Sequence, residues 1–373
     1  MVNKIADVEP VREINIEHVA DRYLFAGRFA EARRMYNRLL FSAPVNDYLL
    51  KGRILKKTGD SYNQQWRFND AVSAYEKAEE ALMKLPESEP MRNEWIELQI
   101  DYCYVLMHLR KVTWYEEKKE RLKPVIEAHG SILQKGRYAY VVFTDLLWKN
   151  GWYMLPDETV IVCERIINLA QVENNLPVKL TAQNMLAFTY LFRHEFIKAR
   201  EISFEILSHI REGEYAEEVL RAYCTICFCY RKENDLEKTR KWVRKAYGLA
   251  DFNKNLTFRY LLDSISGWIY LKAGDLQKAN YFAMTSYNGM SKHRYPFLAF
   301  SLIPLIAIHT KQNKIHKAIH FAFRMLVPNQ QKVTDKINEP LKAAIRCWGN
   351  NDLKGARQFL EEAVKRADEN GFL

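Results

Sequence analysis

Large apolar residues recur along the chain at nearly constant intervals, each inside the same short phrase. The phrase is usually a small or polar residue, one more residue, a large apolar residue, two polar residues and an alanine, as in Gly274-Asp-Leu-Gln-Lys-Ala279. Its apolar residue is found at Phe29, Phe68, Phe196, Leu236, Leu276, Ile315 and Leu353. Spacing places two further units at Trp114 and Leu155. Nine units of about 40 residues, the length of helical-pair repeats, are therefore predicted.

Each unit is predicted to hold two antiparallel helices. In the seventh unit, residues 263–270 belong to the first helix, Gly274 makes the turn and Leu276–Met290 forms the second helix. Glycine suits the turn because it adopts positive φ without strain. The same phrase predicts turns near residues 27, 66, 194, 234, 274, 313 and 351, and an all-α fold.

The small and aromatic positions inside the units carry a family resemblance. Ala20, Tyr23, Ala32 and the closing Pro44 have the spacing of a tetratricopeptide repeat. Repeats of about 40 residues resemble the sensor arrays of bacterial signal-transduction ATPases and MalT-like regulators, and also Rap-type peptide sensors. The resemblance implies a right-handed superhelical solenoid of about nine antiparallel helix pairs. We divide this one continuous solenoid into repeats 1–2 at 13–86, divergent repeats 3–4 at 87–172 and repeats 5–9 at 173–373.

In such arrays the first helix of each unit lines a concave groove that binds a partner. Carrying those positions over gives exposed arginines, aromatics and amides, the residue types that dominate binding hot spots. They are Arg53, Lys56, Asn184, Phe188, Arg221, Phe228, Arg231, Ser264 and Trp268. The alternative is that Phe188, Phe228 and Trp268 fill the space between neighbouring units.

Charge and composition leave a second function open. The chain has 48% hydrophobic residues and a formal net charge of +10, which could favour nucleic acid or an acidic partner. The densest basic stretch lies at 238–245, where Trp242 and Val243 take the inner stripe of a predicted helix. We interpret its basic residues as a solvated outer face, because no nucleic-acid motif accompanies them.

Candidate chemistry is sparse. Cys224, Cys227 and Cys229 are close in sequence, but no second pair of ligands follows, so buried packing thiols are expected. His316 and His320, four residues apart, could hold a metal with His309, although no carboxylate stands beside them. No phosphate-binding glycine loop or nucleophile motif is present. We predict no metal, no cofactor and no enzymatic activity.

The remaining expectations concern compartment and association. The first ten residues have no apolar segment of a signal peptide, and the longest apolar run, 297–308, is too short for a bilayer. We expect a cytoplasmic protein without membrane insertion. The last unit is predicted to expose apolar residues of 341–345 and 353–364, which would favour a homo-oligomer or a partner chain there.

These observations favour a non-enzymatic scaffold or sensor that binds a protein or peptide segment in the concave face, in the regulation or assembly of a larger complex. The alternative is a nucleic-acid-associated regulator that uses the basic surface.

Overall fold

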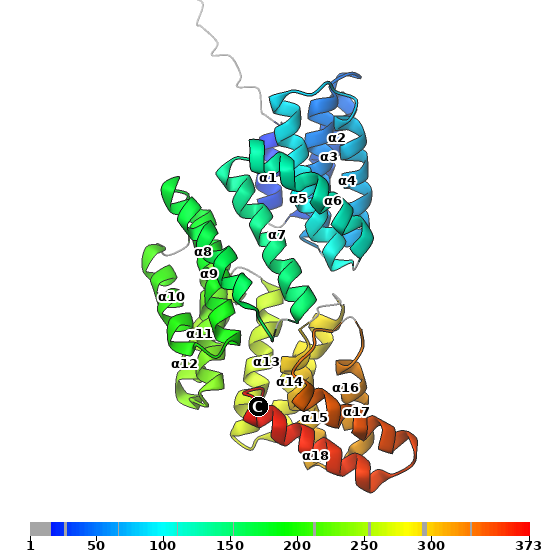
Figure 1. Ribbon diagram of the computed structural model, residues 1–373, viewed down its shortest axis with the longest axis vertical. Coiled ribbons are helices and arrows are strands. Elements are labelled where there is room, and N and C mark those ends of the chain that lie inside the picture. Colours follow the sequence, from blue (N-terminus) through cyan, green and yellow to red (C-terminus); the bar gives the residue numbers. More distant parts are fainter. Residues whose placement is uncertain are drawn as a thin grey trace, which may run out of the picture. The chain divides into compact units, whose positions relative to one another are not determined.

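The described part of the chain is built from α-helices and contains no strand (Figure 1). The computed structural model describes residues 16–25, 28–65, 67–109, 111–151, 153–211, 214–252, 255–292, 297–328 and 330–373. The helices are α1 Ile16–Phe25, α2 Phe29–Ser42, α3 Tyr48–Asn63, α4 Phe68–Leu82, α5 Glu89–His108, α6 Val112–His129, α7 Ile132–Asn150, α8 Asp157–Val172, α9 Leu176–Phe192, α10 Phe196–His209, α11 Ala216–Lys232, α12 Leu236–Phe252, α13 Leu256–Lys272, α14 Leu276–Lys292, α15 Ala299–Lys311, α16 Ile315–Met325, α17 Asp335–Gly349 and α18 Leu353–Glu369.

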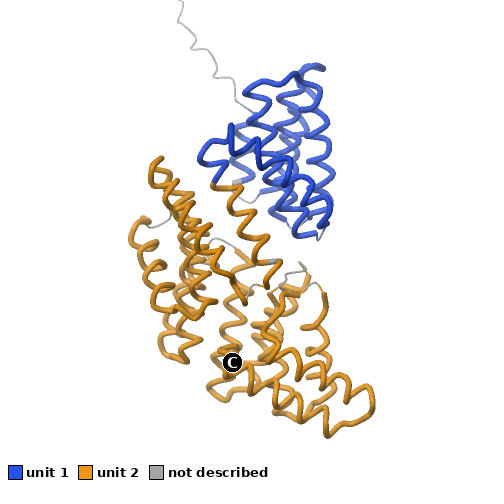
Figure 2. The backbone as a smooth tube through the Cα atoms, in the orientation of Figure 1, with its two compact units in different colours: residues 1–135 blue, residues 136–373 orange. Residues whose placement is uncertain are grey.

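The chain separates into two compact units, residues 1–135 and 136–373 (Figure 2). The boundary lies within the segment 87–172, where the repeat pattern is weakest. The continuity of the solenoid across this boundary stays a prediction. Within the described residues, no helix is long and apolar enough to cross a bilayer.

Helices pack in successive antiparallel pairs, such as α3 with α4, α13 with α14 and α17 with α18, which confirms the predicted fold class. The recurring apolar residues Phe29, Phe68, Phe196, Leu236, Leu276, Ile315 and Leu353 are each the first residue of the second helix of a pair. Trp114, placed by spacing alone, lies in the first turn of α6, and Leu155 lies two residues before α8. The spacing therefore finds the two second helices of the divergent repeats but misses the first residue of each by two positions.

The first residue of the phrase ends the first helix of the pair in the left-handed conformation. Asn234 has φ +61° and Gly274 has φ +82°. The amide of Asn234 donates to the carbonyl of Arg231, and that of Asp235 to Tyr230, the paired bonds of a Schellman turn. His194, Asn313 and Asn351 repeat this geometry, so five predicted turns are confirmed. The predicted turns at 27 and 66 lie outside the described residues.

The close crossing predicted at Gly267 is present. A Cβ atom on Gly267 would stand 3.1 Å from the amide nitrogen of Ala283 and 3.3 Å from the carbonyl oxygen of Ala279. Both are backbone atoms of α14, so a larger side chain would push the two helices apart.

Gly267→Leu is therefore expected to lower the free energy of unfolding by about 1–3 kcal/mol, the usual cost of overpacking. Gly248→Leu is the matched control, because Gly248 is helical and exposed, and a Cβ atom there would have no other atom within 4 Å. That control should be neutral or slightly stabilising, since leucine favours helix more than glycine does. Urea unfolding of both variants measures the difference. Equal stability would contradict the register of the seventh pair.

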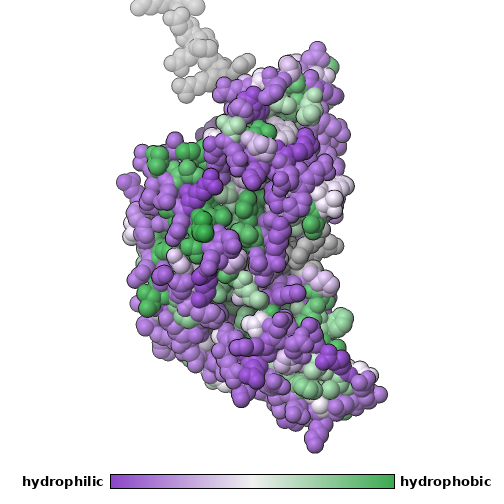
Figure 3. Space-filling model, viewed as in Figure 1, coloured by the Kyte–Doolittle hydropathy of each residue, from purple (hydrophilic) through white to green (hydrophobic). Residues whose placement is uncertain are grey.

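The last pair differs from the others. α18 packs on α15 and α16 as well as on α17, and then passes the end of α13, where Lys272 pairs with Asp368 at 2.8 Å. Its apolar side, formed by Ala356, Leu360, Ala363 and Ala367, is buried, and the surface that it forms in Figure 3 is mainly hydrophilic.

The prediction of an exposed apolar face on the last unit is therefore wrong. Leu341, Ala344 and Leu360 are buried, and among the large residues of the second segment Leu353 stays exposed, at 58%. The error came from assuming that α18 stacks as the second helices before it do. Because α18 instead turns back onto α15 and α16, it covers its own apolar side, and the expected basis for self-association at this end is lost.

Candidate functional site

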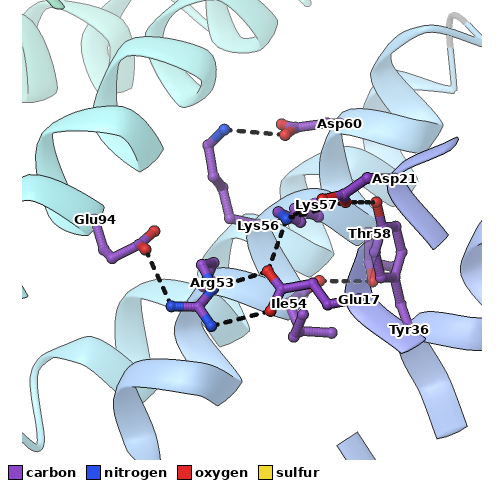
Figure 4. Close-up of polar contacts among 10 residues, drawn as sticks. All are labelled: Glu17, Asp21, Tyr36, Arg53, Ile54, Lys56, Lys57, Thr58, Asp60 and Glu94. Atoms are coloured by element: carbon purple, nitrogen blue, oxygen red, sulfur yellow. Dashed lines mark hydrogen bonds and ion pairs between the residues drawn. The ribbon is translucent and has the colours of Figure 1, made fainter. Parts of the chain in front are cut away.

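Two predicted groove residues, Arg53 and Lys56, lie on α3 in the first unit, inside a network of charges (Figure 4). Arg53 donates to both carboxylate oxygens of Glu17, at 2.9 and 3.0 Å. Lys56 lies 3.0 Å from Asp60 and 2.8 Å from Asp101. Each cation thus has carboxylates of its own chain as partners.

The positive charges of this network are balanced by carboxylates of the same unit, which does not favour binding of an external anion. Burial acts to raise the pKa of Glu17, but hydrogen bonds from Arg53 and Lys57 lower it below its ordinary value. Burial raises the pKa of Asp101 to about 7, against the attraction of Lys56. These charges link α1, α3 and α5. The prediction that Arg53 and Lys56 bind a partner stays a prediction, and the contacts favour a role in holding the first unit together.

The other seven predicted residues lie in the second unit and fall into two groups. Near the start of α11, Arg221 pairs with Glu217 and is 40% exposed. Asn184 of α9 donates to Glu218 at 2.6 Å, and Ser264 of α13 is buried and donates to Leu261. Ten residues of helix, about 15 Å, separate Arg221 from Arg231.

The second group surrounds Arg231, at the ends of α11 and α13. The Arg231 guanidinium lies 5.9 Å from the ring of Phe228, 5.5 Å from Trp268 and 5.1 Å from Phe300. Phe188 is joined to the group through Phe192, with 4.6 Å between ring centroids. We call Phe228, Arg231, Lys232, Trp268 and Phe300, together with Tyr153 and Phe192, the Arg231 cluster.

The expectation that these side chains are exposed is wrong for most of them. Arg231 is 1% exposed, and Phe228, Trp268, Asn184 and Ser264 are also buried. Part of the reason is packing between neighbouring helices, the alternative interpretation of the aromatic positions. The other part is a residue that the sequence reasoning did not single out, Phe372.

Phe372 is placed in the cluster by the end of α18. Gly371 has φ +71°, its amide donates to Asp368, and the amide of Phe372 donates to Ala367, another Schellman turn. The Phe372 ring is 5.3 Å from that of Tyr153 and 6.0 Å from that of Phe300. Its carbonyl oxygen accepts a 2.7 Å hydrogen bond from Nη2 of Arg231. The phrase Asn370-Gly371 ahead of an apolar residue was the available signal.

The polar atoms of the cluster are incompletely paired. Nε and Nη1 of Arg231 and Nε1 of Trp268 are buried without a hydrogen-bond partner, and no described carboxylate pairs with Arg231. Burial lowers the pKa of the Arg231 guanidinium, and burial with the neighbouring Arg231 charge lowers the pKa of Lys232 to about 8. An incompletely compensated buried cation is costly, so the cluster is suited to an anionic group.

Because the pKa of Lys232 is lowered, the free energy of unfolding is expected to change with pH in the alkaline range. Because the folded protein holds this proton less tightly than the unfolded chain, stability rises with pH between about 8 and the unfolded value near 10.4. Below pH 8 Lys232 is protonated in both the folded and the unfolded protein. The full cost of burying its charge then lowers the free energy of unfolding. Lys232→Met should remove this part of the pH dependence, whereas Lys238→Met, on an exposed lysine, should keep it. Urea unfolding between pH 7 and 10.5 measures the free energy of unfolding of both variants. If it changes with pH equally in the two, Lys232 is not the source of the pH dependence.

The other candidate groups behave as structural side chains. Cys224, Cys227 and Cys229 are buried, and burial raises their thiol pKa above the ordinary value, to about 12 for Cys224. His309 is stacked on Phe321 and buried, which lowers its pKa to about 4. Among the described residues no group of three or more His, Cys, Asp or Glu side chains is arranged to hold a metal.

The basic helix α12 has the predicted amphipathic arrangement. Thr239, Val243 and Ala246 are buried, whereas Lys238 is exposed and pairs with Asp235. Arg240 pairs with Glu237 in the same way. These pairs support the solvated outer face and give no support to nucleic-acid binding.

Comparison of folds identifies three solved structures that are similar over most of this chain. A Rap protein complexed with competence and sporulation factor matches with a TM-score of 0.57 and 14% identity, over 86% of this chain and 91% of that chain. The apo form of RapI matches with a TM-score of 0.57 and 11% identity, over 96% and 98% of the two chains. A signal transduction ATPase with a tetratricopeptide repeat sensor, from Pyrococcus horikoshii, gives 0.53 and 15%, over 92% and 49%.

No protein-family model and no curated protein matches the sequence. At these identities the likeness establishes the fold. The chain has the tetratricopeptide-like helical-repeat fold that its sequence predicted.

Proposed function

We propose that this protein is a non-enzymatic sensor scaffold that binds a peptide or protein segment on the first helices of its second unit. The observation that carries the proposal is the Arg231 cluster, in which an incompletely compensated guanidinium lies among Phe228, Trp268 and Phe300. Aromatic side chains and arginine in a desolvated setting are the composition of binding hot spots. The similar Rap structure holds a competence and sporulation factor, which supports a ligand of this class.

The proposal also covers the setting in which the protein acts. Buried free thiols such as Cys224 and Cys227 suit a reducing compartment, so we place the protein in the cytoplasm. Its partner would be a peptide or a protein segment, and binding would regulate or assemble a larger complex. The absence of enzymatic activity remains a prediction.

Affinity selection from a random peptide library tests the proposal. The library is passed over the wild type and over a Phe372→Ala variant, which lacks the side chain that fills the Arg231 cluster. The affinity of each selected peptide is then measured by fluorescence anisotropy. Arg221→Gln should weaken binding, because Arg221 is the exposed arginine on the predicted face. Arg240→Gln is the matched control, since Arg240 also pairs with a glutamate of its own helix but lies on the second helix α12.

Peptides that bind saturably and depend on Arg221, but not on Arg240, support the proposal. Retention of no peptide by either protein contradicts it. Binding of nucleic acid with a steep dependence on salt would favour the alternative regulator instead.

A further inference from the structure

The end of α18 lies against the Arg231 cluster as a bound peptide would. Residues Gly371–Leu373 are buried or half-buried, and Phe372 and Leu373 are 3% and 8% exposed. Beyond the bonds of its own turn, the segment accepts one hydrogen bond, from Arg231 to the carbonyl of Phe372, and the Phe372 ring packs against those of Tyr153 and Phe300. A main-chain polar contact beside a buried side-chain anchor is the usual pattern of peptide recognition.

The segment satisfies its site incompletely. Arg231 has one neutral carbonyl as acceptor, while its Nε and Nη1 atoms and Nε1 of Trp268 have none. Lys232 contributes a further positive charge, 5.0 Å from the Phe372 ring. A carboxylate in place of the carbonyl would accept from two guanidinium nitrogens, and such charge-assisted bonds are about twice as strong as neutral ones.

We propose that Phe372 is an internal stand-in for the ligand, and that the ligand is a peptide ending in an aromatic residue with a free carboxylate. The peptide displaces Gly371–Leu373, packs its aromatic ring against Tyr153 and Phe300, and pairs its carboxylate with Arg231. This inference rests on the proposed function and names its ligand and its regulation.

Displacement has a structural consequence. The hydrogen bond from Arg231 to the carbonyl of Phe372 and the ion pair between Lys272 and Asp368 hold the last turn of α18 against α11 and α13. When Phe372 leaves the cluster, both attachments are weakened and the last turn of α18 is released. The ligand therefore competes with the chain's own Phe372 segment. Its apparent affinity is its intrinsic affinity multiplied by the fraction of molecules in which the cluster is free.

The test uses a probe copied from the chain. A labelled pentapeptide Asp-Glu-Asn-Gly-Phe, the sequence of residues 368–372, is prepared with a free carboxylate and as the amide. Phe372→Ala should bind the free acid at least about 10-fold more tightly than the wild type does, because the competitor is removed. The amide should bind at least about 10-fold more weakly than the acid. Adding Arg231→Gln to Phe372→Ala should abolish the difference between acid and amide.

A second variant keeps the test valid if Phe372→Ala folds poorly. Asp368→Lys places a cation opposite Lys272 on an exposed position and loosens α18 without altering the cluster. It should also gain affinity for the free acid, whereas Glu361→Lys, on the outer side of the same helix, should not. Circular dichroism verifies that each variant is folded.

The results separate this inference from the proposed function. Folded Phe372→Ala and Asp368→Lys proteins that bind the acid no better than the wild type overturn the inference, and so does equal binding of acid and amide. If library peptides still bind the wild type and depend on Arg221, the proposed function survives that failure. If no peptide of either kind binds any variant, both fail.

Discussion

Phe372→Ala is expected to lower the free energy of unfolding of the second unit by about 3–5 kcal/mol, the range for removing a buried phenylalanine. The ring contacts Tyr153 and Phe300 and lies over Lys232. Alanine would leave a cavity among these side chains, and the segment would lose the contacts that bring its carbonyl to Arg231.

Chemical denaturation followed by circular dichroism measures this change. The control is Phe323→Ala on α16, where the side chain is 60% exposed and truncation should cost less than about 1 kcal/mol. Equal, small effects at both positions would mean that Phe372 is not held in the cluster in solution. The internal-ligand proposal would then lose its structural basis.

Local repeat chemistry accounts for the part of the fold that could be predicted from the sequence. The residue that opens each phrase, such as Asn234 or Gly274, tolerates positive φ, and the apolar residue two positions later begins the next helix. Both effects act within a few residues, so the phrase fixes the turn wherever it occurs. The contact of Gly267 with α14 follows from the same register.

The candidate site was less predictable because it depends on contacts between distant residues. Arg231 and Phe372 are 141 residues apart, and their hydrogen bond exists only because α18 turns back onto α15. A repeat pattern describes neighbours and contains no information on such a return. It selected Phe228, Arg231 and Trp268, which the structure brings together, but it predicted exposure where the structure buries them.

Charge pairing in the first unit was also outside the reach of the pattern. Arg53 and Lys56 were predicted to line a groove, yet Glu17 and Asp101 come close enough to pair with them. Which carboxylate meets which cation depends on side-chain geometry between α1, α3 and α5, not on repeat spacing. Paired and unpaired cations therefore looked alike in the sequence, and the structure distinguishes Arg53 from Arg231.

Arg231→Met should separate binding from stability, because the two depend on this side chain in opposite directions. The guanidinium is buried beside one carbonyl and no carboxylate, so its desolvation is only partly offset. Replacing an incompletely compensated buried charge by an apolar side chain of similar volume often stabilises a protein, by about 1–4 kcal/mol. The carbonyl of Phe372 then loses its donor, at a cost of about 1–3 kcal/mol.

We therefore expect Arg231→Met to be as stable as the wild type or more stable by on the order of 1 kcal/mol. Binding of the free-acid pentapeptide, measured in the Phe372→Ala background, should weaken by on the order of 2–4 kcal/mol, the size of an arginine hot spot. Arg240→Met, in the exposed pair with Glu237, should change neither quantity by more than about 0.5 kcal/mol.

A marked loss of stability in Arg231→Met would show that the arginine is a structural residue whose charge is compensated in the folded protein. Gain of stability with loss of binding is the pattern of a functional residue that the fold tolerates at a cost. Retained binding of the acid, with its preference over the amide intact, would exclude Arg231 as the carboxylate partner. Lys232 would then be the remaining cation of the cluster to test, by the same comparison of acid and amide in Lys232→Met.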